Sequence, residues 1–391
     1  MTQTPYATLV GSASPSHLTD AGGTPTDLRS LTSLRFIAAM WVAVYALWPH
    51  LAVTSTPGLV AKGYLGVELF FVLSGFILCH VYLAQTGAGP GEKRFSYKGF
   101  LWARIARVYP LHLATLIGVG VLAIGAGAAG MAVDDGILGW SSLPANLTMT
   151  HAWGLAPESS WNHRSWSISA EWFAYLLFPA FAFVAWRLRA RPLVAVAGAV
   201  ALMAALYLIF PRLAGFHLTE ATIAWGALRI VPCFAYGCAL YLVFRRAPLP
   251  MPGVISAVAA VLLIAAAALG VTDGVLVVLS GALILGLASL PNARAGVLAS
   301  KPAVYLGEIS YSVYMVLVPW QLLAVNLAAK ATNAPDKQLQ LFVWLAILVG
   351  LPMVAAASYH LVEFPARRAL RRLADRQPQR KNKLRSAQSP S

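Results

Sequence analysis

The chain has 391 residues, of which 59% are hydrophobic and 11% charged, and its formal net charge is +15 at pH 7. This composition lies outside that of soluble domains and predicts a membrane protein with many spans. The first 30 residues are polar and lack the basic start and apolar core of a secretory signal peptide, so we expect a disordered cytoplasmic leader over residues 1–30. The three cysteines fall in apolar stretches and have neither a metal-ligand spacing nor a disulfide framework.

Stretches of about 20 apolar residues predict an all-α bundle of ten transmembrane helices. If both termini are cytoplasmic, 23 of the 29 Lys and Arg residues fall on the inner side and 5 on the outer side. This asymmetry is the one that orients membrane proteins, so the basic charge indicates topology and contact with anionic lipid, and no nucleic acid is expected. The predicted membrane domain covers residues 31–372, and a basic cytoplasmic tail covers 373–391. The predicted spans are 31–53, 64–85, 106–131, 165–187, 192–211, 221–244, 252–271, 273–291, 303–328 and 340–363.

The first predicted span contains two ionisable groups, Arg35 near its start and His50 near its end. Such groups are costly in an apolar span unless water, a ligand or a partner receives them, which makes both candidate functional residues. Each also has a structural interpretation. Arg35 suits an anchor that reaches the inner headgroups, and His50 suits an interfacial residue that follows Trp48 and Pro49.

Two further spans each contain a carboxylic acid, Glu68 in the second and Glu171 in the fourth. A lone carboxylate in lipid is heavily penalised, so both must be protonated or paired. Ser74 and Gly75 form a small-residue break in the second span, and such a pair is more often helix packing than chemistry.

A basic and aromatic segment precedes the third span, and its Arg104 and Arg107 are three residues apart. This spacing puts both guanidinium groups on one helical face. One interpretation is an interfacial helix that grips lipid phosphates. The other is a clamp for a phosphorylated ligand from the cytosol, because the planar donor fork of arginine matches phosphate.

The external loop over residues 132–163 is the longest connection and carries polar and aromatic groups, His151 among them, that suit a carbohydrate-like acceptor. Spans five to eight are mostly Ala, Leu and Val and are interpreted as scaffold. Glu220 and Arg229 are the exceptions there, and the sequence leaves their partners open.

The ninth span contains Glu308 and Tyr311, and the tenth ends near Glu363 and Pro365. Because proline interrupts helices, we expect these last two residues to end the tenth helix before the cationic tail.

Six segments together resemble the acyltransferase 3 family of membrane-bound O-acyltransferases, in family order and over about residues 31–372. The resemblance implies a ten-helix domain of the bacterial inner membrane that transfers an acyl group, often acetyl, from cytoplasmic acyl-CoA. The acceptor would be a hydroxyl of a glycan, a lipid-linked sugar or a small molecule at the outer face. The segments are LTSLRFIAAMWV, GYLGVELFFVLSGF, RIARVYP, SWSISAEWFAYLLFP, LGEISYSVY and YHLVEFP.

The resemblance also implies where the donor binds. The phosphates of acyl-CoA suit Arg104 and Arg107 with Arg35 nearby, and Ser74 and Tyr311 are further candidate contacts. A helix rises roughly 22 Å from Arg35 to the end of the first span, which is comparable with a phosphopantetheine arm.

The chain departs from the family pattern at two positions. The family usually has a histidine, taken as the catalytic base, eleven residues after the first-span arginine, and this chain has Ala46 there. A second usual histidine, in the ninth span, is replaced by Leu317. Alanine accepts no proton, so the catalytic histidine cannot be carried over to position 46.

Three explanations compete. His50 lies one turn beyond Ala46 on the same face and is a candidate for the same task. The chain could instead be an inactive relative that keeps the binding architecture. In the third explanation Glu171, Glu68 or Glu308 is the base, with a pKa raised by burial. A transporter with the same spans is a further alternative, because proton-coupled carriers also contain buried ionisable groups.

Overall fold

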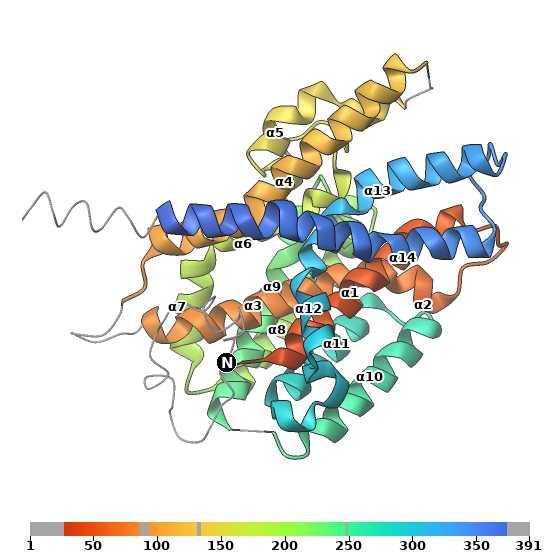
Figure 1. Cartoon of the computed structure of the whole chain (residues 1–391). Helices are drawn as coiled ribbons and strands as arrows, with labels where there is room; N and C mark the ends of the chain where they lie inside the picture. The colour runs from red at the N-terminus through yellow and green to blue at the C-terminus, as the bar shows by residue number, and fades with distance from the viewer. Residues whose placement is uncertain (1–26, 87–93, 131–133, 248, 374–391) are drawn as a thin grey trace, which may run out of the picture.

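The computed structural model describes residues 27–86, 94–130, 134–247 and 249–373 (Figure 1). Within these ranges every regular element is a helix, and seven helices are long and apolar enough to cross a membrane. A helix pair with a 58° bend at its break is an eighth candidate, and two apolar helices are shorter. The bent pair contains α6 (Trp166–Leu176) and α7 (Phe178–Leu188), and the two shorter helices are α10 (Pro252–Ala268) and α11 (Asp273–Ser289). The seven membrane-length helices contain α1 (Arg29–Leu47), α3 (Gly66–Thr86), α4 (Tyr97–Ala128), α8 (Pro192–Ala214), α9 (Gly226–Arg246), α13 (Ser310–Ala331) and α14 (Leu341–Ser358).

The all-helical class is therefore confirmed, and each predicted span has a helical counterpart. Ten crossings and cytoplasmic termini stay predictions. The leader up to residue 26 and the tail from residue 374 lie outside the described residues. Below, the inner end of the bundle means the end where α1 begins, which the charge pattern predicts to be cytoplasmic.

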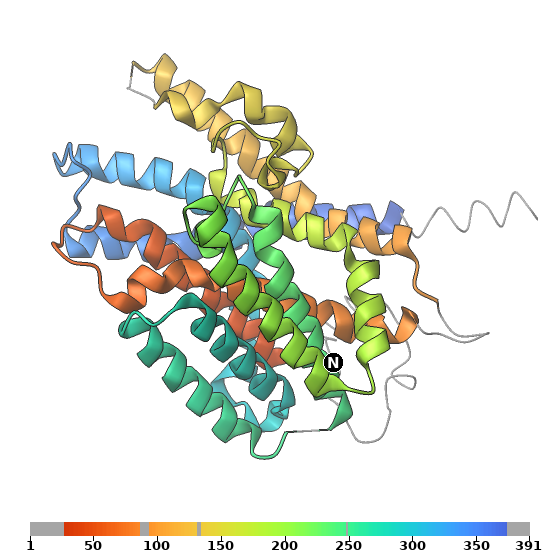
Figure 2. The ribbon, with the colours of Figure 1, turned by 180° about the vertical axis from the view of Figure 1, so that it is seen from behind.

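Helices α3 and α9 run against each other through the middle of the bundle (Figures 1 and 2). A Cβ atom added at Gly75 would lie 2.1 Å from the Phe234 carbonyl oxygen, and one added at Gly237 would lie 1.9 Å from the Val72 carbonyl oxygen. The two backbones therefore touch, as small residues allow in membrane bundles. The packing interpretation of Gly75 is confirmed.

The last helix is longer than the sequence predicts. It continues from α14 to Leu373 through a π-helical turn, Tyr359–Glu363. Pro365 follows this turn without ending the helix, so the prediction that Glu363 and Pro365 end it is wrong. Proline has no N–H to continue the regular ladder, and the wider turn just before it changes that ladder where the missing bond would fall.

Two other spans also differ in their limits. Helix α4 begins at Tyr97, so the basic segment with Arg104 and Arg107 forms its first turns and is no separate interfacial helix. The ninth predicted span is divided between α12 (Lys301–Glu308) and α13, which begins at Ser310. Gly307 stands at this division against the Thr32 carbonyl oxygen of α1.

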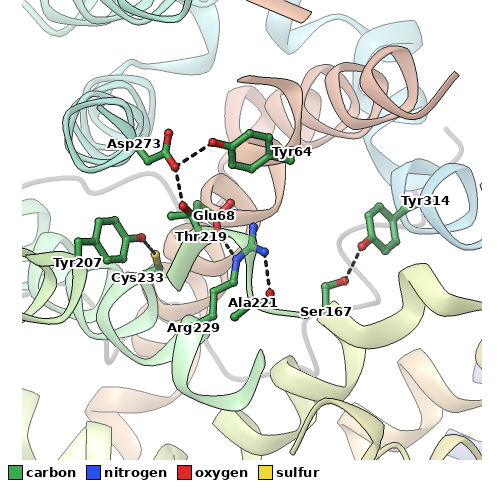
Figure 3. Close-up of polar contacts among 10 residues, drawn as sticks. All are labelled: Tyr64, Glu68, Ser167, Tyr207, Thr219, Ala221, Arg229, Cys233, Asp273 and Tyr314. Carbon is green, nitrogen blue, oxygen red and sulfur yellow. Dashed lines mark hydrogen bonds and ion pairs between the residues drawn. The ribbon is translucent and has the colours of Figure 1, made fainter. Parts of the chain in front are cut away.

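A buried ion pair joins α3 to α9 (Figure 3). The Arg229 Nε donates to Glu68 Oε1 at 2.5 Å, and the two side chains are 3% and 0% exposed. Arg229 also donates to the Ala221 carbonyl oxygen and lies 4.5 Å from the Trp166 ring centroid. Glu68 is thus the partner that the sequence left open for Arg229, whereas Glu220 accepts from the His217 backbone N–H.

A second polar group, at the start of α11, lies near this pair (Figure 3). The Asp273 carboxylate accepts hydrogen bonds from Lys62, Tyr64 and Thr219. It ties α11 to the segment that precedes α3, so the scaffold helices are anchored by side-chain hydrogen bonds as well as by apolar packing.

We expect Gly237→Ala to lower the free energy of unfolding, because the new methyl group would push the α3 backbone away. The loss should be of the order of overpacking, about 1–3 kcal/mol, and is measured as a midpoint of unfolding in detergent. Gly118→Ala is the matched control, since nothing lies within 4 Å of a Cβ added there. Equal stability of the two variants would contradict the contact.

We expect Arg229→Met to cost about 3–5 kcal/mol of unfolding free energy, because it leaves the Glu68 carboxylate buried without its counterion. Glu68→Gln combined with Arg229→Met should recover part of this loss. The exposed pair of Asp27 and Arg29 supplies the control, and Asp27→Asn should change stability by less than about 0.5 kcal/mol. The same unfolding measurement compares all three, and a loss in Asp27→Asn as large as in Arg229→Met would contradict the assignment.

Candidate active site

Arg104 lies on α4 in a cage of aromatic rings. Its guanidinium carbon is 5.8 to 5.9 Å from the ring centroids of Tyr82, Phe100 and Tyr175. Its Nε is buried and has no hydrogen-bond partner among the described residues. The rings hold the side chain by cation–π contact, which leaves donor capacity for a ligand.

Glu171 on α6 lies beside this cage. Its Oε1 accepts from Ser74 Oγ at 2.7 Å and from Tyr175 Oη at 2.5 Å. Glu171, Arg104 and Arg107 all act electrostatically on Tyr175. The structure thus brings together four of the residues that the sequence singled out, from α3, α4 and α6.

Tyr311 connects α13 to the same place. Its hydroxyl donates to the Val108 carbonyl oxygen of α4 at 2.7 Å. Glu363, Glu171 and Arg107 act electrostatically on it. Tyr311 is therefore at the contact between α4 and α13, with acidic and basic groups around it.

Glu363 acts on Tyr311 and lies among further arginines. It accepts from Ser312 Oγ at 2.7 Å, and Arg107, Arg367 and Arg35 act on it electrostatically. Arg371 belongs to the same neighbourhood, since Arg367, Arg104 and Arg107 act on it. We call these five guanidinium groups the arginine cluster: Arg35, Arg104, Arg107, Arg367 and Arg371. The last two lie on the helical extension beyond Glu363, so the sequence-based prediction that the helix ends there hid them.

His50 lies in a different environment. Its Nε2 accepts from Gln321 Nε2 at 2.9 Å, and its carbonyl oxygen accepts from the Leu339 N–H. These contacts lie at the far end of α1, in the short 3-10 turn Trp48–His50. None of the hydrogen bonds described for His50 involves the arginine cluster.

Another polar group, separate from the one around Asp273, lies one helical turn beyond Tyr311. It includes a residue that sequence reasoning missed. His112 on α4 is fully buried, and its Nε2 lies 2.8 Å from the Asn146 carbonyl oxygen. The His151 ring is nearly parallel to it, at 6°, with the centroids 5.9 Å apart. Burial lowers the pKa of His151 to about 4, with the neighbouring His112 adding to the effect. Only the tertiary fold reveals this pair, because 39 positions separate the two histidines along the chain.

Comparisons with known proteins identify the family of this chain. A family model described as an acyltransferase domain matches residues 28–362. The chain belongs to the acyltransferase 3 family. Acyltransferase MdmB of Streptomyces mycarofaciens is 31% identical over 324 residues, 74% of this chain and 78% of the relative. Protein 2 in picA locus of Rhizobium radiobacter is 46% identical over 56 residues, 14% of this chain and 27% of that protein. No solved structure matches significantly.

This acyltransferase is thus a membrane enzyme with several spans that transfers groups other than aminoacyl groups. Its membership in the family favours the enzyme over the transporter. The resemblance of the six sequence segments is confirmed.

Ala46 and Leu317 of this acyltransferase belong to one buried apolar cluster of α1, α13 and α14. Ala46 is 5% exposed and Leu317 is 0% exposed. The two positions are therefore packed among methyl groups, in surroundings that would oppose a charged imidazole.

We expect Ala46→His to lower the free energy of unfolding by about 1–3 kcal/mol, because it buries an imidazole among apolar groups, and to leave acyl transfer no faster. Unfolding in detergent and transfer from acetyl-CoA are measured on the same preparation. Ala46→Val controls for added volume without polarity. A stable Ala46→His variant with faster transfer would instead show that the missing family histidine limits this chain.

Proposed function

We propose that this acyltransferase moves an acyl group, acetyl in the simplest case, from cytoplasmic acyl-CoA to a hydroxyl group at the outer face of the bacterial inner membrane. The acceptor class is a glycan, a lipid-linked sugar or a hydroxylated small molecule. The observation that carries the proposal is the arginine cluster at the inner end of the contact between α4 and α13, with Glu171 beside it.

The cluster has the charge that a coenzyme A donor needs. Its five guanidinium groups face only three carboxylates in the described neighbourhood, those of Glu171, Glu308 and Glu363. The excess of positive charge suits phosphates, and arginine binds them with a planar fork of donors. The buried Nε of Arg104, which has no partner within the described protein, is the donor that such a ligand would satisfy.

The reaction needs few protein groups. The acceptor oxygen bonds to the acyl carbon as the carbon–sulfur bond breaks. The hydroxyl proton passes to a base, and the sulfur leaves as the thiolate of coenzyme A, which takes up a proton from water. A positioned base contributes typically 10²–10⁴-fold to such a step.

We assign Glu171 to positioning. Its Oε1 accepts both of its described hydrogen bonds, from Ser74 and Tyr175, and these bonds hold the carboxylate in one orientation. The carboxylate lies in the same neighbourhood as Arg104 and Arg107, because all three groups act on Tyr175. Glu68 is likewise a poor candidate for the base, because it is the counterion of Arg229.

A second candidate function is a non-catalytic relative that binds acyl-CoA and regulates a partner. The apolar packing around Ala46 and Leu317 favours it, since both family histidines are missing. The two candidates differ in one result. Both predict that membranes containing this protein bind acetyl-CoA, but only the enzyme transfers the acetyl group to an acceptor.

We expect Arg104→Ala combined with Arg107→Ala to weaken acetyl-CoA binding at least about 100-fold, since each charge-assisted hydrogen bond contributes about 1.5–3 kcal/mol. Binding of radiolabelled acetyl-CoA to the purified protein in detergent measures it. Arg191→Ala is the control, because this arginine is exposed and outside the cluster. Wild-type affinity in the double variant would show that the donor binds elsewhere.

A further inference from the structure

Four residues in segments that contact one another beyond the arginine cluster each have a buried polar atom without a hydrogen-bond partner among the described residues. The atoms are His112 Nδ1, Asn146 Oδ1, His151 Nδ1 and Asn162 Oδ1. Buried polar groups are nearly always satisfied, so several orphans at one place indicate a polar ligand or water. We call these four residues the outer polar group.

The outer polar group is held by hydrogen bonds from several elements. Asn162 Nδ2 donates to Thr115 Oγ1 of α4 and to the Met315 carbonyl oxygen of α13, both at 3.0 Å. Asn146, in the short helix α5 (Leu143–Leu147), donates to the Ser142 carbonyl oxygen at 2.9 Å. Both amide groups are therefore oriented, and the two remaining oxygens are acceptors.

His112 is held in one tautomer. Its Nε2 faces a carbonyl oxygen, that of Asn146, and a carbonyl only accepts, so Nε2 carries the proton. The Nδ1 of the neutral ring then carries the lone pair. Since Nδ1 is one of the four orphan atoms, it is a buried base with nothing bound to it within the described protein.

His151 stands behind this base. Its Nε2 lies 3.1 Å from Ser165 Oγ, and the Ala145 backbone also acts on the ring. Its ring is parallel to that of His112, so it limits how far His112 can turn.

On both α4 and α13, the outer polar group lies one helical turn from the contact between Tyr311 and Val108 beside the arginine cluster. Val108 and His112 are four residues apart on α4, and Tyr311 and Met315 are four residues apart on α13. Tyr311 bonds to Val108, and Met315 bonds to Asn162. One helical turn is roughly 5–6 Å, so the two places are neighbours along the contact between α4 and α13.

We propose that the outer polar group binds the acceptor hydroxyl and that His112 Nδ1 takes its proton, in place of the base missing at Ala46. This inference rests on the proposed function. The hydroxyl proton moves to Nδ1 as the acceptor oxygen bonds to the acyl carbon, and the carbon–sulfur bond breaks. The Asn146 and Asn162 oxygens accept hydrogen bonds from neighbouring hydroxyls, so a polyhydroxylated acceptor such as a sugar is the class that fits.

The test uses membrane vesicles that contain the full chain, radiolabelled acetyl-CoA, and octyl glucoside below its micellar concentration as the hydroxylated probe. His112→Gln keeps a donor for the Asn146 carbonyl and has no nitrogen that takes up a proton. We expect its kcat to fall at least about 100-fold, with acetyl-CoA affinity within about twofold of the wild type. The control is His80→Gln at a half-buried histidine, which packs on Tyr241 and Phe244 and should keep the wild-type rate.

A second measurement does not depend on folding of a variant. Diethyl pyrocarbonate modifies unprotonated imidazole, and mass spectrometry locates the modified residue in the wild-type protein. We expect modification of His112 to abolish acyl transfer. Octyl glucoside should slow the modification, and hydroxylamine should reverse the modification.

The outcomes separate the two proposals. Normal transfer by His112→Gln, or full activity after His112 is modified, overturns the role of His112 and leaves the proposed function standing. A His112 that diethyl pyrocarbonate never reaches also overturns it. If the wild-type protein does not bind acetyl-CoA, or binds it but transfers no acetyl group, the proposed function and this inference are both overturned.

Discussion

The cost of placing charge in an apolar bundle is the constraint on which the rest of this structure depends. The buried carboxylates and guanidinium groups are met by one another, by hydroxyl groups or by aromatic rings. Glu68 and Arg229 neutralise each other deep between α3 and α9. At the inner end several guanidinium groups lie near one another, and Arg367, Arg104 and Arg107 all act on Arg371. A phosphorylated donor is the kind of ligand that such a group of positive charges suits.

The contact between α4 and α13 connects the arginine cluster with the outer polar group. Tyr311 and Val108 join these helices beside the arginine cluster, and Asn162 joins both helices one turn further on. The arrangement places the arginine cluster and the outer polar group in series along one interface. The proposed transfer needs this order, because in it the acyl group and the hydroxyl arrive from opposite membrane faces.

Some of the site was predictable from residue types alone. Arg104 and Arg107 were singled out because two guanidinium groups at helical spacing suit phosphate, and in the structure both act on Tyr175 together with Glu171. His50 was a weaker inference, because its position one turn beyond Ala46 said nothing of its neighbours, and in the structure it bonds to Gln321. His112 was missed because a histidine in an apolar stretch has no local pattern that distinguishes a buried base from a satisfied core residue.

The sequence by itself determined that this protein is an all-helical membrane acyltransferase, because the apolar stretches and the six segments that resemble the family are visible along the chain without knowledge of its contacts. It also identified Glu171 and the arginines of α4, since ionisable residues in apolar stretches are visible wherever the chain goes. Only the tertiary structure decided that Arg229 pairs with Glu68, that the last helix continues past Pro365, and that His112 meets His151. The physical reason is that pairing, burial and orphaned hydrogen-bond capacity depend on contacts between helices far apart in the chain, and no local pattern encodes these contacts.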